Sequence, residues 1–405
     1  MSWPQTPFET LYAVPSRNGI YKPKEFHGTG CRMVNMGELF GFDFISDQDM
    51  ERVELNDAEQ SISALEDGDL LFGRRSLVEA GAGKCSLVVE PPDILTFESS
   101  IIRVRLDKRR VNPRFLYYYF RSPQGRGLVR SIVSGTNVKG IRSSELKKLP
   151  VATPPKTTQD NIASTLSLYD ALIDNNQRRT TILQNAARLL YQEWFVHLRF
   201  PGHEHTRIDK GIPQGWERKT AHEALEILSG GTPKTSVPEF WGGEIPFYTP
   251  KDAPDGVWVT DCERNITEVG LSGCNSRLFP KGTVFISARG TVGKLNIAQR
   301  PMAMSQSCYA LVRKGHLTQP FVFFAMQEAV AALRQQAVGA VFDAIIVDTF
   351  KRISFLIPPP KTVRLFDEVA RPVLAQLENL TLQNQKLRAA RDLLLPRLMT
   401  GEVTV

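Results

Sequence analysis

The chain contains one sequence pattern twice, at an offset of 204 residues. The stretch ELKKLPVATPPKTTQDNIASTL (145–166) aligns without a gap with TFKRISFLIPPPKTVRLFDEVA (349–370), and each places a short apolar run before two prolines and a long helical pattern. The identities kept by this alignment include Pro154/Pro358, Pro155/Pro359, Thr158/Thr362, Leu183/Leu387, Leu189/Leu393 and Leu190/Leu394. The pattern predicts two copies of one structural unit, with coincidental similarity of two unrelated domains as the alternative.

A globular part precedes each pair of prolines. Short apolar runs such as IIRVRL (101–106) and TVFIS (283–287) are typical of strands, because Gly, Pro and Asp interrupt them on either side. Aromatic stretches after Pro113 and Pro320 are typical of helices. We therefore expect an α+β protein with two mixed α/β domains. The predicted segments are a first domain (1–155), a first helix (156–200), a second domain (210–358) and a second helix (361–400).

Each helical segment carries an apolar seam whose positions alternate by four and three residues. The first seam contains Ile162, Leu166, Tyr169, Ile173, Asn176, Thr180, Leu183, Ala187, Leu190 and Trp194, and the second contains Phe366, Ala370, Val373, Leu377, Leu380, Asn384, Leu387, Arg391, Leu394 and Leu398. Neither seam can remain exposed, so the two cover each other or pack against the globular domains. We expect the helices to pair as a coiled coil, the first capped by Thr158.

Connectivity sets the direction of this pair. The first helix ends by FPGH (200–203) and the second domain follows after a short connection. Because the termini of a domain commonly lie close together, the second helix starts where the first one ended, and the two run antiparallel. In that arrangement Asn176 meets Asn384. A buried amide pair costs stability in any shifted register, so it predicts a single register; the alternative is that both amides lie in exposed layers.

Charge is segregated along the chain, whose net charge is +7. Residues 101–150 contain thirteen Lys or Arg and two acids, whereas residues 1–100 contain eight Lys or Arg and seventeen acids. The basic segment favours a polyanionic partner such as nucleic acid, with a merely solvated basic face as the alternative. The acidic stretch from Asp43 to Asp69 is expected to face away from DNA.

Four stretches resemble the specificity subunit of type I restriction-modification enzymes. They are QDNIASTLSLYDALI (159–173), LLYQEWFVHLRFPG (189–202), SGGTPKTSVPEFWGGEIPFYTPKD (229–252) and LLPRLMTGEV (394–403). The resemblance covers essentially the whole chain, and it rests on the combination, since each stretch alone is weakly specific. The second helix departs from the family pattern at Val363 and Phe366 and contains Pro372 and Pro396; Pro372 is expected to kink or interrupt it.

The resemblance implies a non-catalytic DNA-sequence-recognition subunit, in which each globular domain reads one half of a split site in double-stranded DNA. The helices would space the domains and dock two modification subunits, which are methyltransferases, and restriction subunits would add a motor and nuclease in the full complex. No cofactor would be bound by this chain, since S-adenosylmethionine, ATP and magnesium would belong to the partners. The alternatives are a stand-alone two-headed DNA-binding regulator and a coiled-coil scaffold for proteins only.

Two Gly-rich stretches follow strand patterns at matching places, GAGKCS (81–86) and GTVGKL (290–295). Neither fits a nucleotide-binding phosphate loop, because Val78 and Ala288 occupy the position of its first glycine. We interpret them as loops that bring cations toward DNA phosphates or base edges, with a plain surface turn as the alternative. The predicted DNA-binding residues are Arg74, Arg75, Lys84, Lys139, Arg142, Lys234, Lys251, Arg289 and Lys294.

Catalysis by the chain itself is not supported. The segment NPRF (112–115) lacks the second proline of an NPPY-type methyltransferase motif, and we find no nuclease motif of the PD…ExK type. Five scattered cysteines without a CxxC pair support neither a disulfide framework nor a zinc site, and His197, His203 and His205 fit a solvated linker better than a metal site. No segment reaches the ~20 apolar residues of a membrane span, and the amino terminus is unlike a signal peptide, so we expect a cytosolic protein without a membrane partner.

Overall fold

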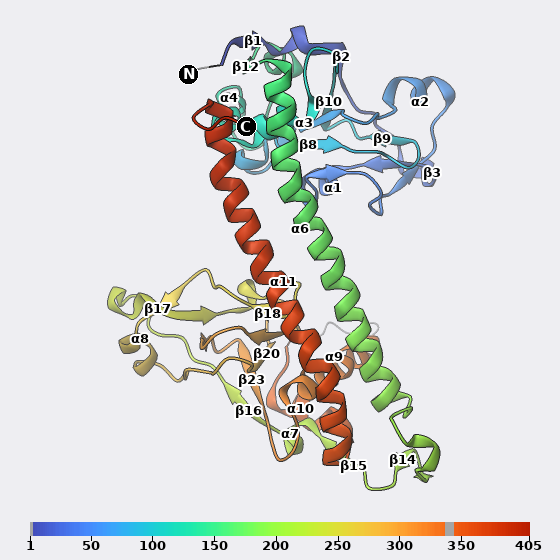
Figure 1. The fold of residues 1–405 in the computed structure, drawn as a ribbon, viewed down its shortest axis with the longest axis vertical. Helices are drawn as coiled ribbons and strands as arrows, with labels where there is room; N and C mark the ends of the chain where they lie inside the picture. The colour runs from blue at the N-terminus through green and yellow to red at the C-terminus, as the bar shows by residue number, and fades with distance from the viewer. Residues whose placement is uncertain (1–2, 337–343) are drawn as a thin grey trace. The chain divides into compact units, whose positions relative to one another are not determined.

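The computed structural model describes residues 3–336 and 344–405. The chain forms two compact units, of which the first combines Met1–Leu172 with Leu387–Val405 and the second is Ile173–Lys386. Each unit contains one globular domain and a stretch of each of two long helices (Figure 1). We call the globular part of the first unit domain 1 and that of the second unit domain 2.

Domain 1 combines two main sheets with short helices. Its strands are β1 (Gln5–Pro7), β2 (Tyr12–Asn18), β3 (His27–Val34), β4 (Phe44–Ile45), β5 (Arg52–Val53), β6 (Leu70–Gly73), β7 (Arg75–Ser76), β8 (Cys85–Val88), β9 (Leu95–Phe97), β10 (Ile101–Leu106), β11 (Lys139–Gly140) and β12 (Pro150–Ala152). Its helices are α1 (Met36–Gly41), α2 (Asp57–Ser63), α3 (Pro113–Arg121), α4 (Pro123–Ser131) and α5 (Ser143–Leu146). The larger sheet has the order β2-β10-β6-β8-β4 and the smaller one β5-β3-β9, while β1 pairs with β12 and β7 with β11.

The core of domain 1 has two layers, one on each side of β10. The predicted aromatic stretch forms α3, whose first turn is capped by the Asn112 side chain. The ring of Phe120 in this helix lies 5.0 Å from that of Phe72 in β6, centroid to centroid. Ile102 of β10 belongs to this aromatic cluster, whereas its neighbour Ile101 belongs to a second buried cluster, as expected for successive residues of a strand that is covered on both faces.

Domain 2 repeats the strand order of domain 1. Its strands are β13 (Ile208–Asp209), β14 (Ile212–Pro213), β15 (Glu217–Thr220), β16 (Leu225–Ser229), β17 (Trp241–Tyr248), β18 (Trp258–Val259), β19 (Asn265–Ile266), β20 (Val284–Ser287), β21 (Leu295–Ala298), β22 (Ala303–Met304), β23 (Cys308–Arg313) and β24 (Ser354–Ile357). Its helices are α7 (Ala221–Ala224), α8 (Glu268–Ser272), α9 (Gln319–Gln336) and α10 (Val347–Arg352).

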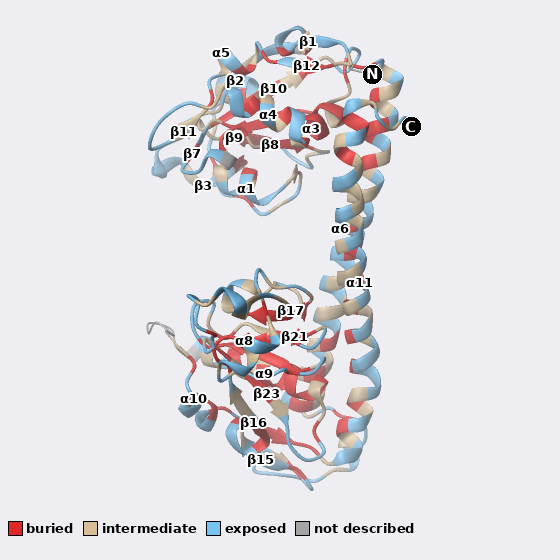
Figure 2. Cartoon of the chain, turned by 90° about the vertical axis from the view of Figure 1, so that its left-hand side faces the viewer, coloured by how far each residue is buried: buried red, intermediate tan, exposed pale blue. Residues whose placement is uncertain are grey.

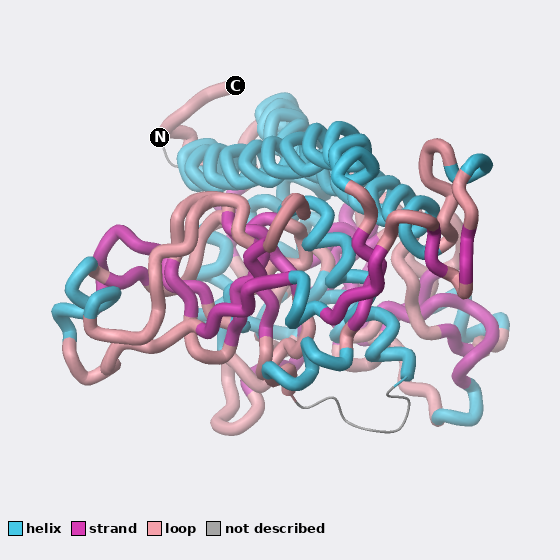
Figure 3. The backbone as a smooth tube through the Cα atoms, turned by 90° about the horizontal axis from the view of Figure 1, so that it is seen from below, coloured by secondary structure: helices cyan, strands magenta, loops and turns pink. Residues whose placement is uncertain are grey.

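The larger sheet of domain 2 has the order β16-β23-β20-β21-β18 and the smaller one β19-β17-β22. In both domains the short edge strand of the larger sheet is parallel to its neighbour, and the other pairs of that sheet are antiparallel. Figure 2 shows buried residues concentrated in the strands and adjoining helices of each domain, and Figure 3 shows the same mixture of strands and short helices. The predicted internal repeat of mixed α/β domains is therefore confirmed.

The two long helices are α6 (Lys156–Tyr191) and α11 (Pro360–Thr400). Every predicted seam position on both helices is buried or half-buried. Both predicted ways of covering the seams occur, because the helices contact each other and also enter the domain cores, as Leu166 does in domain 1 and Phe366 in domain 2. None of the described helices is both long and apolar enough to cross a membrane.

The predicted antiparallel direction is confirmed by contacts inside the second unit. The side chain of Asn176 on α6 contacts that of Asn384 on α11, and further along α6 the ring of Tyr191 lies 5.8 Å from that of Phe366. The residue number thus rises along α6 while it falls along α11. The first unit shows the same direction. Asp170 of α6 forms an ion pair with Arg391 of α11, and Asn161, nearer the start of α6, contacts Val405, which follows the end of α11.

The ends of α6 differ from the prediction. Thr158 is not the cap, because the helix already begins at Lys156, and the amide of Gln159 donates the first helical hydrogen bond to the carbonyl of Pro155 (3.0 Å). At the other end α6 passes into one π turn over Gln192–Val196 and stops before residue 200. The chain leaves the helical direction there because Leu198 adopts a positive φ of 60°.

Helix α11 is not interrupted by its prolines, so the expected interruption at Pro372 does not occur, whereas a kink there stays a prediction. It remains a single α-helix from Pro360 to Thr400. Pro372 has no N–H to donate to the carbonyl of Glu368, one turn earlier in the helix, and both residues are exposed. Water can satisfy a carbonyl on an exposed face, which removes most of the cost of the missing hydrogen bond.

Asn176 and Asn384 form a buried pair in the interior of the helix pair. The Asn176 Nδ2 donates to the Oδ1 of Asn384 (3.0 Å), and the Asn384 Nδ2 donates to the carbonyl of Ile173 (3.3 Å). Each asparagine is only 7% exposed. Their predicted meeting in one layer is confirmed, whereas their role in setting the register stays a prediction.

Replacing one asparagine with leucine should destabilise the protein. Asn176→Leu leaves the Oδ1 of Asn384 without its donor in an apolar layer, while the Nδ2 of Asn384 keeps its bond to the carbonyl of Ile173, so we expect the free energy of unfolding to fall by about 1–3 kcal/mol. Asn175→Leu, on the exposed face one residue away, is the matched control and should change it by less than about 0.5 kcal/mol. Urea denaturation measures both, and equal stabilities of the two variants would contradict the proposed role.

Candidate nucleic-acid interface

The basic segment 101–150 is largely neutralised by acids inside the first unit. Arg105 holds the fully buried Asp69 through two hydrogen bonds (2.8 and 2.7 Å) and also contacts Glu66. Further ion pairs in this segment are Lys108–Asp67, Arg109–Asp107, Arg121–Asp43, Arg130–Glu79, Lys147–Glu9 and Lys148–Glu145. The segregated charges of the sequence are thus partners within the fold, and the segment as a whole is not a continuous basic surface.

Four of the predicted DNA-binding residues of domain 1 lie close together. Strand β7 pairs with β11, so that Arg75 is opposite Gly140, the neighbour of Lys139. The carbonyl of Arg74 accepts a hydrogen bond from the residue just before Arg142 (3.0 Å). Within the described chain, Arg75, Lys139 and Arg142 form no ion pair, which leaves their charges free for an anionic partner.

Lys84 does not join this group. Its Nζ donates to the carbonyl of Phe40 at the end of α1 (2.6 Å), and burial lowers the pKa of Lys84. Gly83, which precedes it, turns with a positive φ of 67° directly against Val129 of α4. Lys84 therefore serves the packing of its loop in this structure.

In domain 2 two predicted residues, Lys251 and Arg289, line the same cleft of about 570 Å³. Arg264, Gln306 and Thr249 also line it. The cleft walls thus combine three cations with the carboxylates of Asp252 and Glu263 and with neutral hydrogen-bonding groups.

Arg264 lies in an ordered position at this cleft. The centre of its guanidinium group is 3.4 Å from the ring centroid of Trp241, as in a cation–π contact. The indole N–H of Trp241 donates to the carbonyl of Lys234 (3.2 Å), which places the predicted residue Lys234 beside this pair. The structure therefore brings Lys234, Lys251 and Arg289 into one neighbourhood.

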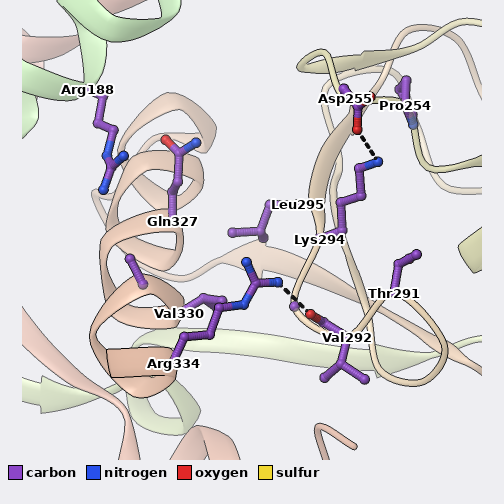
Figure 4. A pocket seen from close by; sticks show the side chains of 12 residues that line it. Arg188, Pro254, Asp255, Thr291, Val292, Lys294, Leu295, Gln327, Val330 and Arg334 are labelled. Atoms are coloured by element: carbon purple, nitrogen blue, oxygen red, sulfur yellow. Dashed lines mark hydrogen bonds and ion pairs between the residues drawn. The ribbon is translucent and has the colours of Figure 1, made fainter. Parts of the chain in front are cut away.

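Lys294 lies elsewhere, in a second pocket of about 550 Å³ between α6, α9 and the Gly-rich loop (Figure 4). It forms an ion pair with Asp255 (2.7 Å), and Arg334 of α9 donates to the carbonyl of Val292 (2.6 Å). Arg188 of α6 also borders this pocket but is engaged by Glu328 (2.6 Å). Because these cations already have partners, the pocket offers no comparable set of free groups.

The two Gly-rich loops share one packing arrangement. A Cβ atom on Gly83 would lie 2.2 Å from the Val129 side chain, and one on Gly293 would lie 2.8 Å from that of Val330. Both glycines also have positive φ angles. The resemblance to a phosphate loop therefore has a structural cause: each glycine lets a tight turn pack against a helix of its own domain.

Arg264, Gln306 and Thr232 were not predicted from the sequence. Thr232 donates to the amide oxygen of Gln306 at the cleft. No motif marks Arg264 or Gln306, and Arg264 is brought to Trp241 by the small sheet. The presence of Trp241 within the family-like stretch 229–252 is the one signal that could have directed attention to this edge.

All five cysteines are free, and burial raises the pKa of Cys308 to about 12, which keeps its thiol protonated. In the described parts of the chain no group of three or more His, Cys, Asp or Glu side chains could hold a metal ion.

Comparison with known proteins gives one consistent result. The type I restriction modification DNA specificity domain matches this chain twice, over residues 41–185 and 213–389. The type I restriction enzyme MjaIX specificity subunit of Methanocaldococcus jannaschii is 25% identical over 363 residues, covering 82% of this chain and 83% of that protein. The HindI specificity subunit of Haemophilus influenzae is 22% identical over 410 residues, covering 85% and 88%. In fold, the chain is similar to the S subunit of a type I system from M. genitalium, with a TM-score of 0.60 and 17% identity over 98% of this chain and 96% of that one.

Substitution should have different effects at Arg105, which is ion-paired inside domain 1, and at Arg142, which is exposed. Arg105→Met leaves the buried carboxylate of Asp69 with the backbone N–H of Glu66 but without its cation, so we expect the free energy of unfolding to fall by about 3 kcal/mol. Arg142→Met removes an exposed charge and should change stability by less than about 0.5 kcal/mol while weakening DNA binding. Thermal unfolding and DNA titration measure the two effects. Wild-type stability of Arg105→Met would refute the structural role of that ion pair.

Proposed function

The chain belongs to the type I restriction-modification DNA specificity family, and we propose that each of its globular domains reads one half of a bipartite site in double-stranded DNA. The chain recognises DNA sequence as a specificity subunit. The duplication supports a division of this task between the two domains. Since both have the same strand order, each can present the equivalent surface to its own half-site.

One observation carries this proposal: an arginine occupies the same position in both domains. The carbonyls of Arg74 and Ala288 accept matching hydrogen bonds from isoleucine amides (3.0 and 2.9 Å), so the next residues, Arg75 and Arg289, are equivalent. Both are exposed, and neither side chain is hydrogen-bonded or ion-paired to the described residues. A cation kept at the same place in two otherwise divergent domains suits a contact that both half-sites share, such as a phosphate or a guanine.

The helices provide two further parts of the proposed function. The buried asparagine pair favours one register of α6 against α11, and a fixed register would hold the two readers at one separation along DNA. Exposed apolar side chains on these helices supply docking surfaces for modification subunits. Such residues are Leu168 and Leu172 in the first unit and Ile182 and Leu189 in the second.

One position of this proposed docking surface is repeated. Leu189 on α6 corresponds to Leu393 on α11 in the internal repeat, and the two are 59% and 66% exposed. Identical exposed leucines in two helices have no role in covering the seam, so the repeat supports two modification subunits. We propose that these partners, with restriction subunits in the full complex, perform methyl transfer and cleavage and bind S-adenosylmethionine, ATP and magnesium.

An exchange of domains tests the proposal. Residues 210–358 are replaced with the corresponding domain of another specificity subunit, and the sequence methylated by the assembled complex is determined by sequencing. One half of the recognised site should change while the other half stays the same. Exchange of residues 1–155 is the matched control and should change the opposite half. A change of both halves by either exchange would show that the domains do not read separately.

A further inference from the structure

A second pair of equivalent positions carries opposite charges. The amide of Met33 in β3 donates to the carbonyl of Glu51 (2.8 Å), and the amide of Phe247 in β17 donates to the carbonyl of Arg264 (3.0 Å). Since β3 and β17 occupy the same place in the duplicated small sheet, Glu51 in domain 1 corresponds to Arg264 in domain 2. The two domains therefore present an acceptor and a donor at one and the same position.

The residue that contacts each of these side chains is also equivalent. His27 is paired with Val53 in the small sheet of domain 1, and Trp241 is paired with Ile266 in that of domain 2. The Nδ1 of His27 lies 2.8 Å from the carboxylate of Glu51, and the hydrogen bond to Glu51 raises the pKa of His27. In domain 2 the ring of Trp241 supports the guanidinium of Arg264. Each domain thus holds its position-specific side chain on a neighbouring ring.

The support of the two side chains leaves their hydrogen-bonding groups available. The Arg264 guanidinium stacks on a ring face and forms no hydrogen bond or ion pair with the described residues, so its N–H donors are free at the cleft that also contains Arg289. The carboxylate of Glu51 contacts His27 through Oε1 and accepts a long hydrogen bond from the Nδ2 of Asn35 through Oε2 (3.5 Å), but it is about half exposed, and each oxygen can accept a further hydrogen bond. A side chain held in place before binding loses less conformational entropy on contact with a ligand.

Opposite charge at equivalent positions excludes a shared phosphate contact. A phosphate oxygen requires a donor, as Arg75 and Arg289 supply in both domains, whereas a carboxylate repels it. Base edges differ in this respect, because guanine offers two acceptors in the major groove and cytosine offers an amino donor. Arginine can donate to the two acceptors of guanine, and glutamate can accept from the amino group of cytosine.

We propose that Glu51 and Arg264 are specificity-determining residues, each reading one base edge in the half-site of its own domain. Arg264 donates two hydrogen bonds to a guanine, and Glu51 accepts one from the amino group of a cytosine. For Glu51 the proposal replaces the expectation that the whole acidic stretch from Asp43 to Asp69 faces away from DNA. This inference rests on the proposed function, and it explains how one duplicated scaffold reads two different half-sites: the common arginines bind in both, while this position differs.

Conservative substitutions separate base reading from charge. Arg264→Lys keeps the positive charge but loses the planar pair of donors, and Glu51→Gln keeps the size but replaces one acceptor with an amide donor. Arg313→Lys at the far end of β23 is the matched control, because its side chain contacts the carbonyl of Gly315 and does not line the cleft. All three side chains are exposed or half-exposed, so the variants should fold.

Each full-length variant is purified in complex with its modification subunits and incubated with a library of DNA duplexes that contain a randomised core. Sequencing of the bound fraction gives the base preference at every position. Arg264→Lys should reduce the preference for guanine at one position of one half-site by roughly 5- to 150-fold, and Glu51→Gln should alter one position of the other half-site. Arg313→Lys should leave both half-sites as in the wild type.

Two other outcomes have distinct meanings. If the wild-type complex selects a sequence and both variants select the same one, or if binding to all sequences falls equally, the assignment of Glu51 and Arg264 is overturned while the proposed function stands. If the wild-type complex selects no sequence at all, the proposed function itself is contradicted, and this inference is overturned with it.

Discussion

The hydrogen-bonded pair of Asn176 and Asn384 is the interaction on which the rest of the account depends. The seams of α6 and α11 are apolar over most of their length, and leucine layers alone would tolerate several registers. A buried amide without a partner costs about 1–3 kcal/mol, so the layer in which both amides meet is favoured over its neighbours. A fixed register of α6 against α11 would determine which part of each helix packs into a domain core and which part remains exposed to partners.

Duplication explains how so similar a scaffold can serve two readings. The strand order is the same in both domains, and matching backbone hydrogen bonds identify equivalent residues even where the sequences have diverged. Some of these positions keep their chemistry, as Arg75 and Arg289 do. Others change it, as Glu51 and Arg264 do, and the ring at the equivalent neighbouring position changes with them, from His27 to Trp241. The backbone thus fixes where a side chain is presented, and the side chain is free to determine what is recognised.

The features of the sequence that repeat or have a period predicted the fold well: the offset of 204 residues predicted the duplicated domains, and the seams predicted the antiparallel helices and the meeting of the two asparagines. Features that depend on long-range partners were predicted poorly. The basic segment was interpreted without its acids, because Asp69 lies 36 residues from Arg105 in the sequence. Lys84 and Lys294 were chosen by motif, but a carbonyl and a carboxylate already hold them. Arg264 was missed because only the small sheet brings it to Trp241.

The most direct test of the account concerns the helices as a spacer between two readers. One heptad is added to α6 and one to α11 at matched places, which lengthens the helix pair by about 10 Å, and the gap between the half-sites is then read from the sequences that the complex methylates. If α6 and α11 set the spacing, the gap should be longer by ~3 base pairs, at 3.4 Å for each base pair, with both half-sites unchanged. An unchanged gap with full methylation would show that α6 and α11 do not set the distance between the two readers.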